Sequence, residues 1–562
     1  MKNRKRSKRF FALTSAVLMC ATTMSIFGGC GTPAEDSGYD ATKANISVAT
    51  FTGGVGRAWL DDAIARFEEL YKDADYFQEG RVGVKVSLVG DKTTYVGNAL
   101  AESGNLKKDV YFTEAVDYYT FVNKGMVADI SDVVTGSLST YGESGTIEDK
   151  LNPSLKDFMT AKDGKYYMLP FYDGFYGFTY DVDLFEQKGF YFDDDGDFIR
   201  ISDFDSREEF EAAKSNGPDG VDGTYDDGLP ATYDQMIELC DQIARKSCVP
   251  FCYSGEKAEG YVNRPFFAYV ADYEGYDRFV LNNSFSGTAR LVKTITENAG
   301  TMEATIEFED VPISASNGYE LQRQAGKYYA LKMEEALFGS TKYIGGTFNM
   351  TDYTVAQSNF IKSKYTNKPY AMLSEGVWWE NEAEPTFVEI ENSRGEKKTD
   401  RRFGFLPVPK VNAEAAGGQT MFSVNSSFGF INKNCQNMAL AKEFMRFLHT
   451  DAEMSKFSAK TSIPRSLIYE VDPADRENAT YYGKTLIDMR SAAQVVYPFS
   501  SANIVIQNPN NFDPNTWFAY STVGGRLRTN AFNTFKENQA NALQYFNGLY
   551  TYQYGIWNGL QK

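Results

Sequence analysis

The sequence predicts an α/β protein with more than one domain. Its first part alternates strand and helix patterns, beginning with a buried strand over 45–51 and an amphipathic helix over 57–72. The chain has 562 residues, of which 43% are hydrophobic, and this length exceeds what one core normally serves. A stretch with one proline and two glycines, over 170–177, then separates the first unit from the rest.

The spacing of apolar residues predicts each helix and strand of this first unit. Apolar residues at helical spacing form one face of the first helix: Leu60, Ile64, Phe67 and Tyr71. The later elements are a strand over 83–90, a helix over 94–103, a strand over 109–115 and a helix over 116–125. We expect the ligand-binding loops of such a sheet to follow the carboxyl ends of its strands.

The first thirty residues are typical of an export signal. A basic start is followed by a largely apolar run over 10–27, which is short for a membrane span and interrupted by Ser and Thr. The sequence "IFGGC" resembles the lipobox of bacterial lipoproteins, whose cysteine becomes the first mature residue and carries a lipid. We therefore expect a signal peptide over 1–29, lipidation of Cys30 and a flexible tether over 30–44. Phe27 replaces the usual Leu, so ordinary cleavage remains an alternative.

The charge of the chain excludes several classes of partner. The formal net charge is -18 although the leader contributes six basic residues, so the exported part is strongly acidic. Such a surface repels nucleic acid and anionic lipid headgroups, which leaves the lipid anchor as the only expected membrane contact. Aromatic residues make up 15% of the chain, and tyrosine suits a surface that grips a neutral ligand.

The scarcity of histidine and the cysteine spacing limit metal and nucleophile chemistry. His449 is the only histidine, and it lies near the end of a predicted helix. Most metal-hydrolase and Ser-His-Asp sites need more imidazole than this. Four cysteines follow the leader without a CxxC motif, and any of three disulfide pairings is open to Cys240, Cys248, Cys252 and Cys435.

Several stretches together resemble a known family. They include the sequences "TYDVDLF" and "TYDQM", and the segment "AMLSEGVWWENEA" that contains two adjacent tryptophans. The full set of stretches is 100–134, 166–190, 229–251, 368–383, 402–410 and 428–466. In this order they resemble the extracellular solute-binding proteins of ABC importers, the group that includes maltose-binding protein.

The resemblance implies a two-lobed periplasmic-binding-protein-like fold with a ligand held between the lobes. Three passages between lobes are expected, near Pro170–Tyr176, Met372–Trp378 and Ile431–Asn437. The expected boundaries are 45–172 and 378–431 for the first lobe, and 173–377 and 432–562 for the second. The second lobe then contains an acidic insertion and a helical C-terminal extension. The implied function is capture of a neutral sugar or oligosaccharide by a monomer on the outer face of the membrane, for delivery to ABC permease subunits.

The same resemblance implies the residues of the ligand site. Trp378 is the expected stacking platform for a sugar ring, and Trp379 a wall or core residue, with the reverse assignment left open. Glu375 and Asp173 are expected to accept hydrogen bonds from sugar hydroxyls. The remaining candidates are Phe51, Thr52, Glu114, Tyr172 and Tyr176.

A glycine-rich acidic loop is the only candidate for a metal site, and no other cofactor is expected. Its carboxylates are Asp219, Asp222, Asp226 and Asp227. Glycine turns and oxygen ligands suit a structural calcium ion, but the EF-hand spacing does not match. An acidic surface turn is the alternative.

Two other classes of function remain compatible with the sequence. A secreted carbohydrate-active hydrolase needs two carboxylates across the scissile bond, and no recognisable catalytic pair is present. A surface sensor or adhesin binds a solute without importing it, and would have the same anchor and lobes.

Overall fold

The computed structural model describes residues 38–255, 258–345, 352–424, 427–512, 516 and 518–561. The predicted signal peptide, Cys30 and the first part of the predicted tether lie outside these residues. Within the described residues, no helix has both the length and the apolar content that a bilayer span requires.

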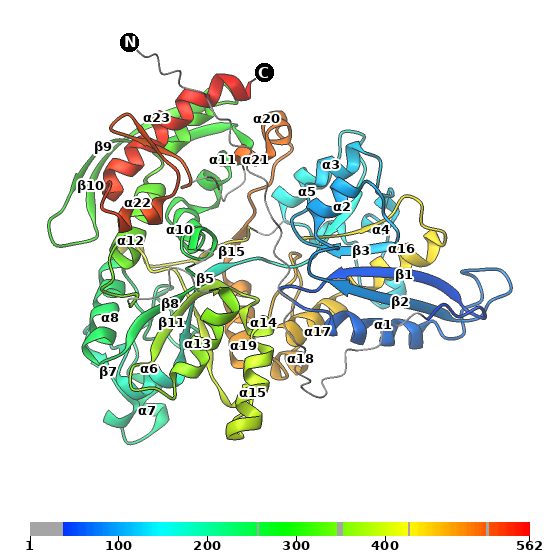
Figure 1. Cartoon of the computed structure of the whole chain (residues 1–562), viewed down its shortest axis with the longest axis horizontal. Helices are drawn as coiled ribbons and strands as arrows, with labels where there is room; N and C mark the ends of the chain where they lie inside the picture. The colour runs from blue at the N-terminus through cyan, green and yellow to red at the C-terminus, as the bar shows by residue number, and fades with distance from the viewer. Residues whose placement is uncertain are drawn as a thin grey trace, which may run out of the picture. The chain divides into compact units, whose positions relative to one another are not determined.

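The first sheet is mixed and draws four of its five strands from the N-terminal part of the chain (Figure 1). Its order is β2 (Val84–Asp91), β1 (Ala44–Phe51), β3 (Val110–Thr113), β14 (Phe428–Ile431) and β4 (Met168–Pro170). β1 runs parallel to β2 and β3, whereas β14 is antiparallel to both of its neighbours. Each element predicted over 45–125 is present, because the period of its apolar residues matches the face that it buries.

The second sheet is also mixed. Its order is β12 (Phe403–Leu406), β5 (Tyr176–Asp181), β11 (Tyr370–Gly376) and β8 (Val249–Tyr253). β11 runs parallel to β8 and antiparallel to β5, and every residue of β5 is buried. We call each sheet, with the helices that pack on it, a lobe; the first sheet belongs to the first lobe and the second sheet to the second.

The chain leaves the first sheet after β4 and enters the second at β5, which is the passage expected near Pro170–Tyr176. The other two expected places are wrong. β11 and β12 both belong to the second sheet, so the chain does not change sheets near Met372–Trp378. β14 and α16 (Met438–Phe447) both pack in the first lobe, so residues 431–437 do not form a passage either.

The expected lobe boundaries change accordingly. Within 378–431, β12 hydrogen-bonds to β5 and therefore belongs to the second lobe rather than the first. Within 432–562, α16 packs against β1, and α17 (Asp451–Thr461) packs against α1 (Ala58–Leu70), so both belong to the first lobe. The physical reason is long-range strand pairing, which periodicity along the chain does not reveal.

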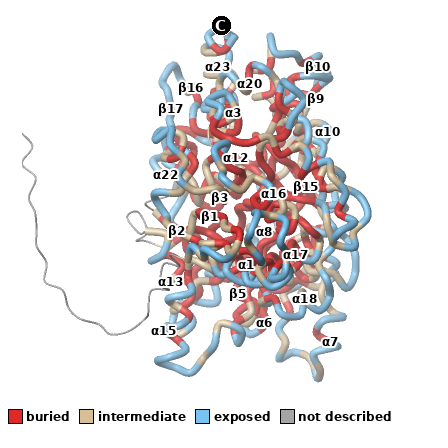
Figure 2. Tube along the Cα trace, turned by 90° about the vertical axis from the view of Figure 1, so that its right-hand side faces the viewer, coloured by how far each residue is buried: buried red, intermediate tan, exposed pale blue. Residues whose placement is uncertain are grey.

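The last two helices of the chain pack on the second lobe. These helices, α22 (Ala531–Lys536) and α23 (Ala542–Leu560), pack against α12 (Ala325–Phe338). A small separate core joins the C-terminal part of the chain to residues 281–321, with Trp557 at its centre between Phe285 and Phe512. Figure 2 shows buried residues along the inner elements and exposed residues along outer helices such as α7 (Arg207–Ala212) and α15 (Glu384–Arg394).

One carboxylic acid lies in the core without a partner. Glu334 on α12 is fully buried, and neither of its side-chain oxygens has a hydrogen-bond partner among the described residues. Burial raises the pKa of Glu334 well above 4.5. The folded protein therefore keeps Glu334 protonated at pH values where the unfolded chain ionises it.

We predict that Glu334→Gln stabilises the protein, and that the gain grows with pH. Above pH 4.5 the unfolded chain loses a proton that the folded state retains, so stability falls as pH rises until the raised pKa is passed. The variant lacks this loss, worth about 1.4 kcal/mol per pH unit. Urea unfolding of the unaltered protein and of the variant at pH 5 and pH 8 measures the gain in unfolding free energy. An equal gain at the two pH values would contradict the prediction.

Candidate functional site

The two lobes touch at a glycine loop that follows β1. Gly54 has φ +60°, and its backbone N–H donates to Glu382 Oε1 of the second lobe at 3.3 Å. A Cβ at this position would lie 3.0 Å from Glu114 Oε1, 3.1 Å from the Tyr172 hydroxyl and 3.7 Å from Trp378 Cβ. Residue 54 must therefore be glycine for both conformation and space. Three of the predicted site residues meet around it.

Trp378 and two tyrosines form an aromatic cluster on the second-lobe side of this contact. The rings of Trp378 and Tyr176 pack edge to face with centroids 5.0 Å apart, and Tyr261 lies 5.9 Å from Tyr176. Arg264 donates to the Tyr176 hydroxyl, and its guanidinium lies 4.8 Å from the centre of that ring. Trp378 is 9% exposed. The predicted proximity of Tyr176 and Trp378 is present in the structure.

Trp379 lies in the core of the second lobe. It is fully buried, with its ring 5.1 Å from Phe403, 5.8 Å from Phe360 and 5.7 Å from Tyr482. The chain turns into α14 (Trp379–Glu382) here, so the two tryptophans follow a helical turn rather than an extended strand. Of the two predicted roles for Trp379, the structure places it as a core residue and not as a ligand contact.

Three glutamates gather beside the aromatic cluster, and we call Glu114, Glu375 and Glu382 the glutamate cluster. Glu375 is 1% exposed, and Gly376 N–H donates to its Oε1 at 3.0 Å. Gln357 Nε2 donates to Glu382 Oε2 at 3.0 Å and to Glu375 Oε2 at 3.5 Å, so one amide joins two carboxylates. The Tyr172 hydroxyl donates to Glu114 Oε1.

The glutamate cluster is electrostatically unfavourable when all three groups are ionised. Burial, together with the charge of Glu382, raises the pKa of Glu114 to about 7 and that of Glu375 well above its ordinary value. Burial also raises the pKa of Glu382. Among the described residues, no Lys or Arg forms an ion pair with any of the three. Such perturbed groups are typical of functional sites.

Two residues of this arrangement, Glu382 and Gln357, are not predicted from the sequence. Glu382 lies four residues after Trp378, so the helical turn of α14 brings it back to the same contact. Gln357 lies on α13 (Tyr353–Ser363), which carries no recognisable motif, and only the fold brings it to Glu375.

Asp173 has a structural role instead of the predicted ligand contact. Its carboxylate is fully buried and accepts from Arg490 Nε at 3.2 Å and from the Tyr497 hydroxyl at 2.8 Å. Arg490 opposes the effect of burial, which raises the pKa of Asp173. This ion pair attaches α19 (Tyr481–Ala492) to the passage between β4 and β5.

Phe51 and Thr52 lie at the end of β1, where the prediction placed them. The Phe51 ring covers Gly53, since a Cβ there would lie 2.5 Å from the ring. Thr52 N–H donates to the Asp91 carbonyl at 3.3 Å, which ties the ends of β1 and β2 together. Phe51 thus contacts the glycine loop that follows β1, and Thr52 contacts the end of β2.

The acidic loop is held together by its own hydrogen bonds. Asp226 accepts from Asp219 N–H at 3.0 Å and from the Thr224 hydroxyl at 2.6 Å. Asp227 accepts from Gly223 N–H at 2.9 Å, and Asp222 is exposed. Across the residues that the structure describes, no three His, Cys, Asp or Glu side chains are placed to hold a metal ion. Calcium binding at this loop stays a prediction.

The histidine and the cysteines are structural. His449 is fully buried, and burial lowers its pKa well below 6.5; its Nε2 lies 2.9 Å from Arg465 Nη2. The neutral imidazole therefore accepts from the guanidinium. Cys240, Cys248, Cys252 and Cys435 are all free thiols, so none of the three disulfide pairings forms.

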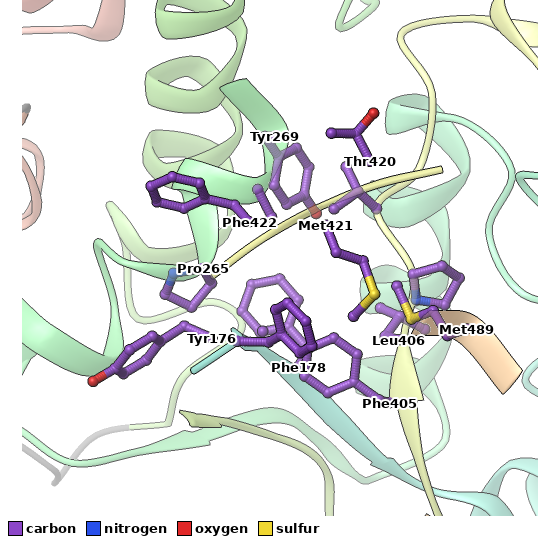
Figure 3. Close-up of a pocket in the computed structure, with 15 residues that line it drawn as sticks. Tyr176, Phe178, Pro265, Tyr269, Phe405, Leu406, Thr420, Met421, Phe422 and Met489 are labelled. Atoms are coloured by element: carbon purple, nitrogen blue, oxygen red, sulfur yellow. The ribbon is translucent and has the colours of Figure 1, made fainter. Parts of the chain in front are cut away.

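A cavity in the second lobe lies between β5, β12 and α10 (Pro265–Phe279) and is lined almost wholly by apolar side chains (Figure 3). Its volume of about 20 Å³ holds one water molecule at most. The Tyr176 hydroxyl points away from the other lining residues in Figure 3. This cavity is a packing defect of the lobe and is too small for a sugar.

Comparisons with known proteins agree on the family and the fold. A family model for bacterial extracellular solute-binding proteins matches residues 72–476. The apo-form of RafE from Streptococcus pneumoniae superposes with a TM-score of 0.51 and 13% identity, covering 93% of this chain and 100% of that one. Maltose-bound MalE3 of T. maritima gives a TM-score of 0.50 and 12% identity, covering 91% and 100%. No match was found among curated protein sequences. The expected α/β, two-lobed, periplasmic-binding-protein-like fold is confirmed.

The free energy of unfolding distinguishes the structural carboxylate of Asp173 from the carboxyl group of Glu375 at the candidate site. We predict that Arg490→Met costs about 3–5 kcal/mol of unfolding free energy, because Asp173 is left buried without its cation. Glu375→Gln should be neutral or stabilising in the ligand-free protein, because it removes repulsion from Glu382. Urea unfolding at pH 7.5 tests both variants. A loss of unfolding free energy below about 1 kcal/mol for Arg490→Met would contradict the structural role of Asp173. A large loss for Glu375→Gln would contradict the assignment of Glu375 to the ligand site.

Proposed function

Because the chain belongs to the family of bacterial extracellular solute-binding proteins, we propose that it captures a sugar or oligosaccharide outside the cell and delivers it to an ABC permease. Members of this family bind solutes and are not enzymes, so the hydrolase alternative is excluded. The proposed site is the contact between the lobes around Gly54, with Trp378 as its aromatic platform and the glutamate cluster as its polar wall.

The pairing of aromatic and carboxylate groups at one contact carries this proposal. A sugar ring offers C–H groups to an aromatic face and hydroxyl donors around its rim. Trp378 and Tyr176 supply aromatic surface, and the carboxyl groups of Glu375 and Glu382 supply hydrogen-bond acceptors beside them. Maltose is bound by the similar MalE3, which has the same fold.

The geometry also supports a capture mechanism. Gly54 and Glu114 come from the first lobe, whereas Trp378 and Glu382 come from the second. A solute that contacts residues of both lobes stabilises the arrangement in which they touch, by its difference in affinity for the touching and separated forms. We propose that the permease recognises the form with the lobes in contact.

The location of the protein completes the proposal. We propose that Cys30 carries a lipid and that residues 31–44 tether a monomer to the outer face of the membrane. Confinement near the membrane raises the effective concentration of the protein at its permease. Permease genes beside the gene for this chain would favour import, and their absence would favour the sensor or adhesin.

Thermal melting with a panel of mono- and oligosaccharides tests the ligand class. A sugar bound only by the folded state raises the melting temperature, and a concentration of 100 times Kd stabilises by about 2.7 kcal/mol. We predict such a shift for at least one sugar, its recovery uncut, and its loss in Trp378→Ala. Tyr554→Ala, which alters a residue that is 58% exposed on α23, is the matched control and should keep the shift.

Two results would contradict this function. If no sugar in the panel shifts the melting temperature, the carbohydrate assignment fails. If Tyr554→Ala and Trp378→Ala lose the shift equally, the solute does not bind at the contact between the lobes.

A further inference from the structure

Among the residues that the structure describes, no Lys or Arg forms an ion pair with the glutamate cluster, and Arg264 donates to the Tyr176 hydroxyl instead. Glu375 and Glu382 share the amide of Gln357, and both Glu114 and Glu375 are destabilised as anions by Glu382. Three carboxylates at one contact are costly to ionise unless a positive charge joins them. The exposed Lys92 acts on Glu382 only through space, without an ion pair.

A buried acceptor next to the cluster points to the same need. Gln357 is 0% exposed, and its Oε1 has no hydrogen-bond partner among the described residues. Its Nε2 already donates to Glu375 and Glu382. An unsatisfied buried carbonyl destabilises the fold, so a donor is missing at this place. Glu375, Glu382 and Gln357 together offer three acceptors, and an ammonium group has three N–H donors.

The surroundings favour an organic cation over a metal ion. Among the described residues no set of three His, Cys, Asp or Glu side chains is arranged as metal ligands, this cluster included. The neighbouring groups are instead aromatic rings: Trp378, Tyr176 and Tyr261, followed by Tyr353 at 6.3 Å from Tyr261. Aromatic faces attract organic ammonium groups through the quadrupole of the ring.

We propose that the solute of this protein carries a positively charged amine, which Glu375, Glu382 and Gln357 hold while its ring stacks on Trp378. The inference rests on the proposed function and refines it, because it replaces the neutral sugar expected from the sequence with an amino sugar or amino-oligosaccharide. The ammonium charge compensates the carboxylates, and the Gln357 carbonyl gains its missing donor.

Calorimetric titration of the purified protein with a matched ligand series tests this proposal. The series has an amino sugar, its N-acetyl form and the parent hexose, each as monomer and short oligomer, and a simple diamine without a sugar ring. We expect the amino form to bind at least about tenfold more tightly than the other two sugars, because it alone makes charge-assisted bonds. Binding should also release protons, measured as a heat that depends on the buffer.

The outcomes separate the two proposals. If the hexose or the N-acetyl form binds as tightly as the amine, the cationic solute is refuted while sugar binding stands. If the diamine binds and no sugar does, the carbohydrate assignment is wrong while the cation site stands. If no compound binds, both proposals fail.

Isosteric variants locate the site. Glu382→Gln and Glu375→Gln should each weaken binding of the amino form by about tenfold to a hundredfold, and leave a neutral sugar nearly unaffected. Glu380→Gln is the control, because Glu380 is buried on the same helix as Glu382 but accepts from the Thr480 hydroxyl at 2.8 Å. If all three variants weaken binding of the amino form equally, the amine does not bind at Glu375 and Glu382. The ligand series on the unaltered protein remains decisive if a variant fails to fold.

Discussion

The contact between the two lobes depends on the absence of a side chain at residue 54. Its positive φ and its close approach to Glu114, Tyr172 and Trp378 both require glycine. Through this approach the Gly54 amide reaches Glu382 of the other lobe. The loop after β1 thus brings the polar residues of one lobe onto the aromatic residues of the other.

A second constraint holds the passage between the lobes in place. Asp173 lies three residues after the end of β4, and its fully buried carboxylate forms an ion pair with Arg490 from the C-terminal part of the chain. Removing one partner of such a pair leaves an uncompensated buried charge, so the pair fixes the geometry of the passage. Asp173 thus has a cation as its partner, whereas the three carboxyl groups of the glutamate cluster have no ion-pair partner among the described residues.

The sequence was sufficient where structure follows from local pattern. The alternation over 45–125 correctly predicts the elements of the first lobe, and Pro170 with the following glycines correctly predicts the first passage between sheets. It was insufficient where pairing is distant. β14 enters the first sheet between β3 and β4 from more than 250 residues away, and Asp173 meets a partner 317 residues along the chain.

The sequence likewise predicts the residues of the candidate site that lie near strand ends, but not those that distant contacts place there. Glu114, Tyr172, Tyr176, Glu375 and Trp378 were identified and do come together, because each lies at or near the end of a strand. Trp379 lies in the core, which is one of its two predicted roles, whereas Asp173 binds a distant arginine in place of the predicted ligand contact. Gln357 was missed because a single amide on a helix carries no motif.

A crystal structure of the protein with a bound amino sugar would show whether the glutamate cluster holds the amine. We predict an amine nitrogen within about 3 Å of Glu375 and Glu382, with the sugar ring against Trp378 and the Gly54 loop closed over it. A sugar bound away from Gly54, or one whose amine points to solvent while its neutral face meets the glutamates, would contradict this prediction.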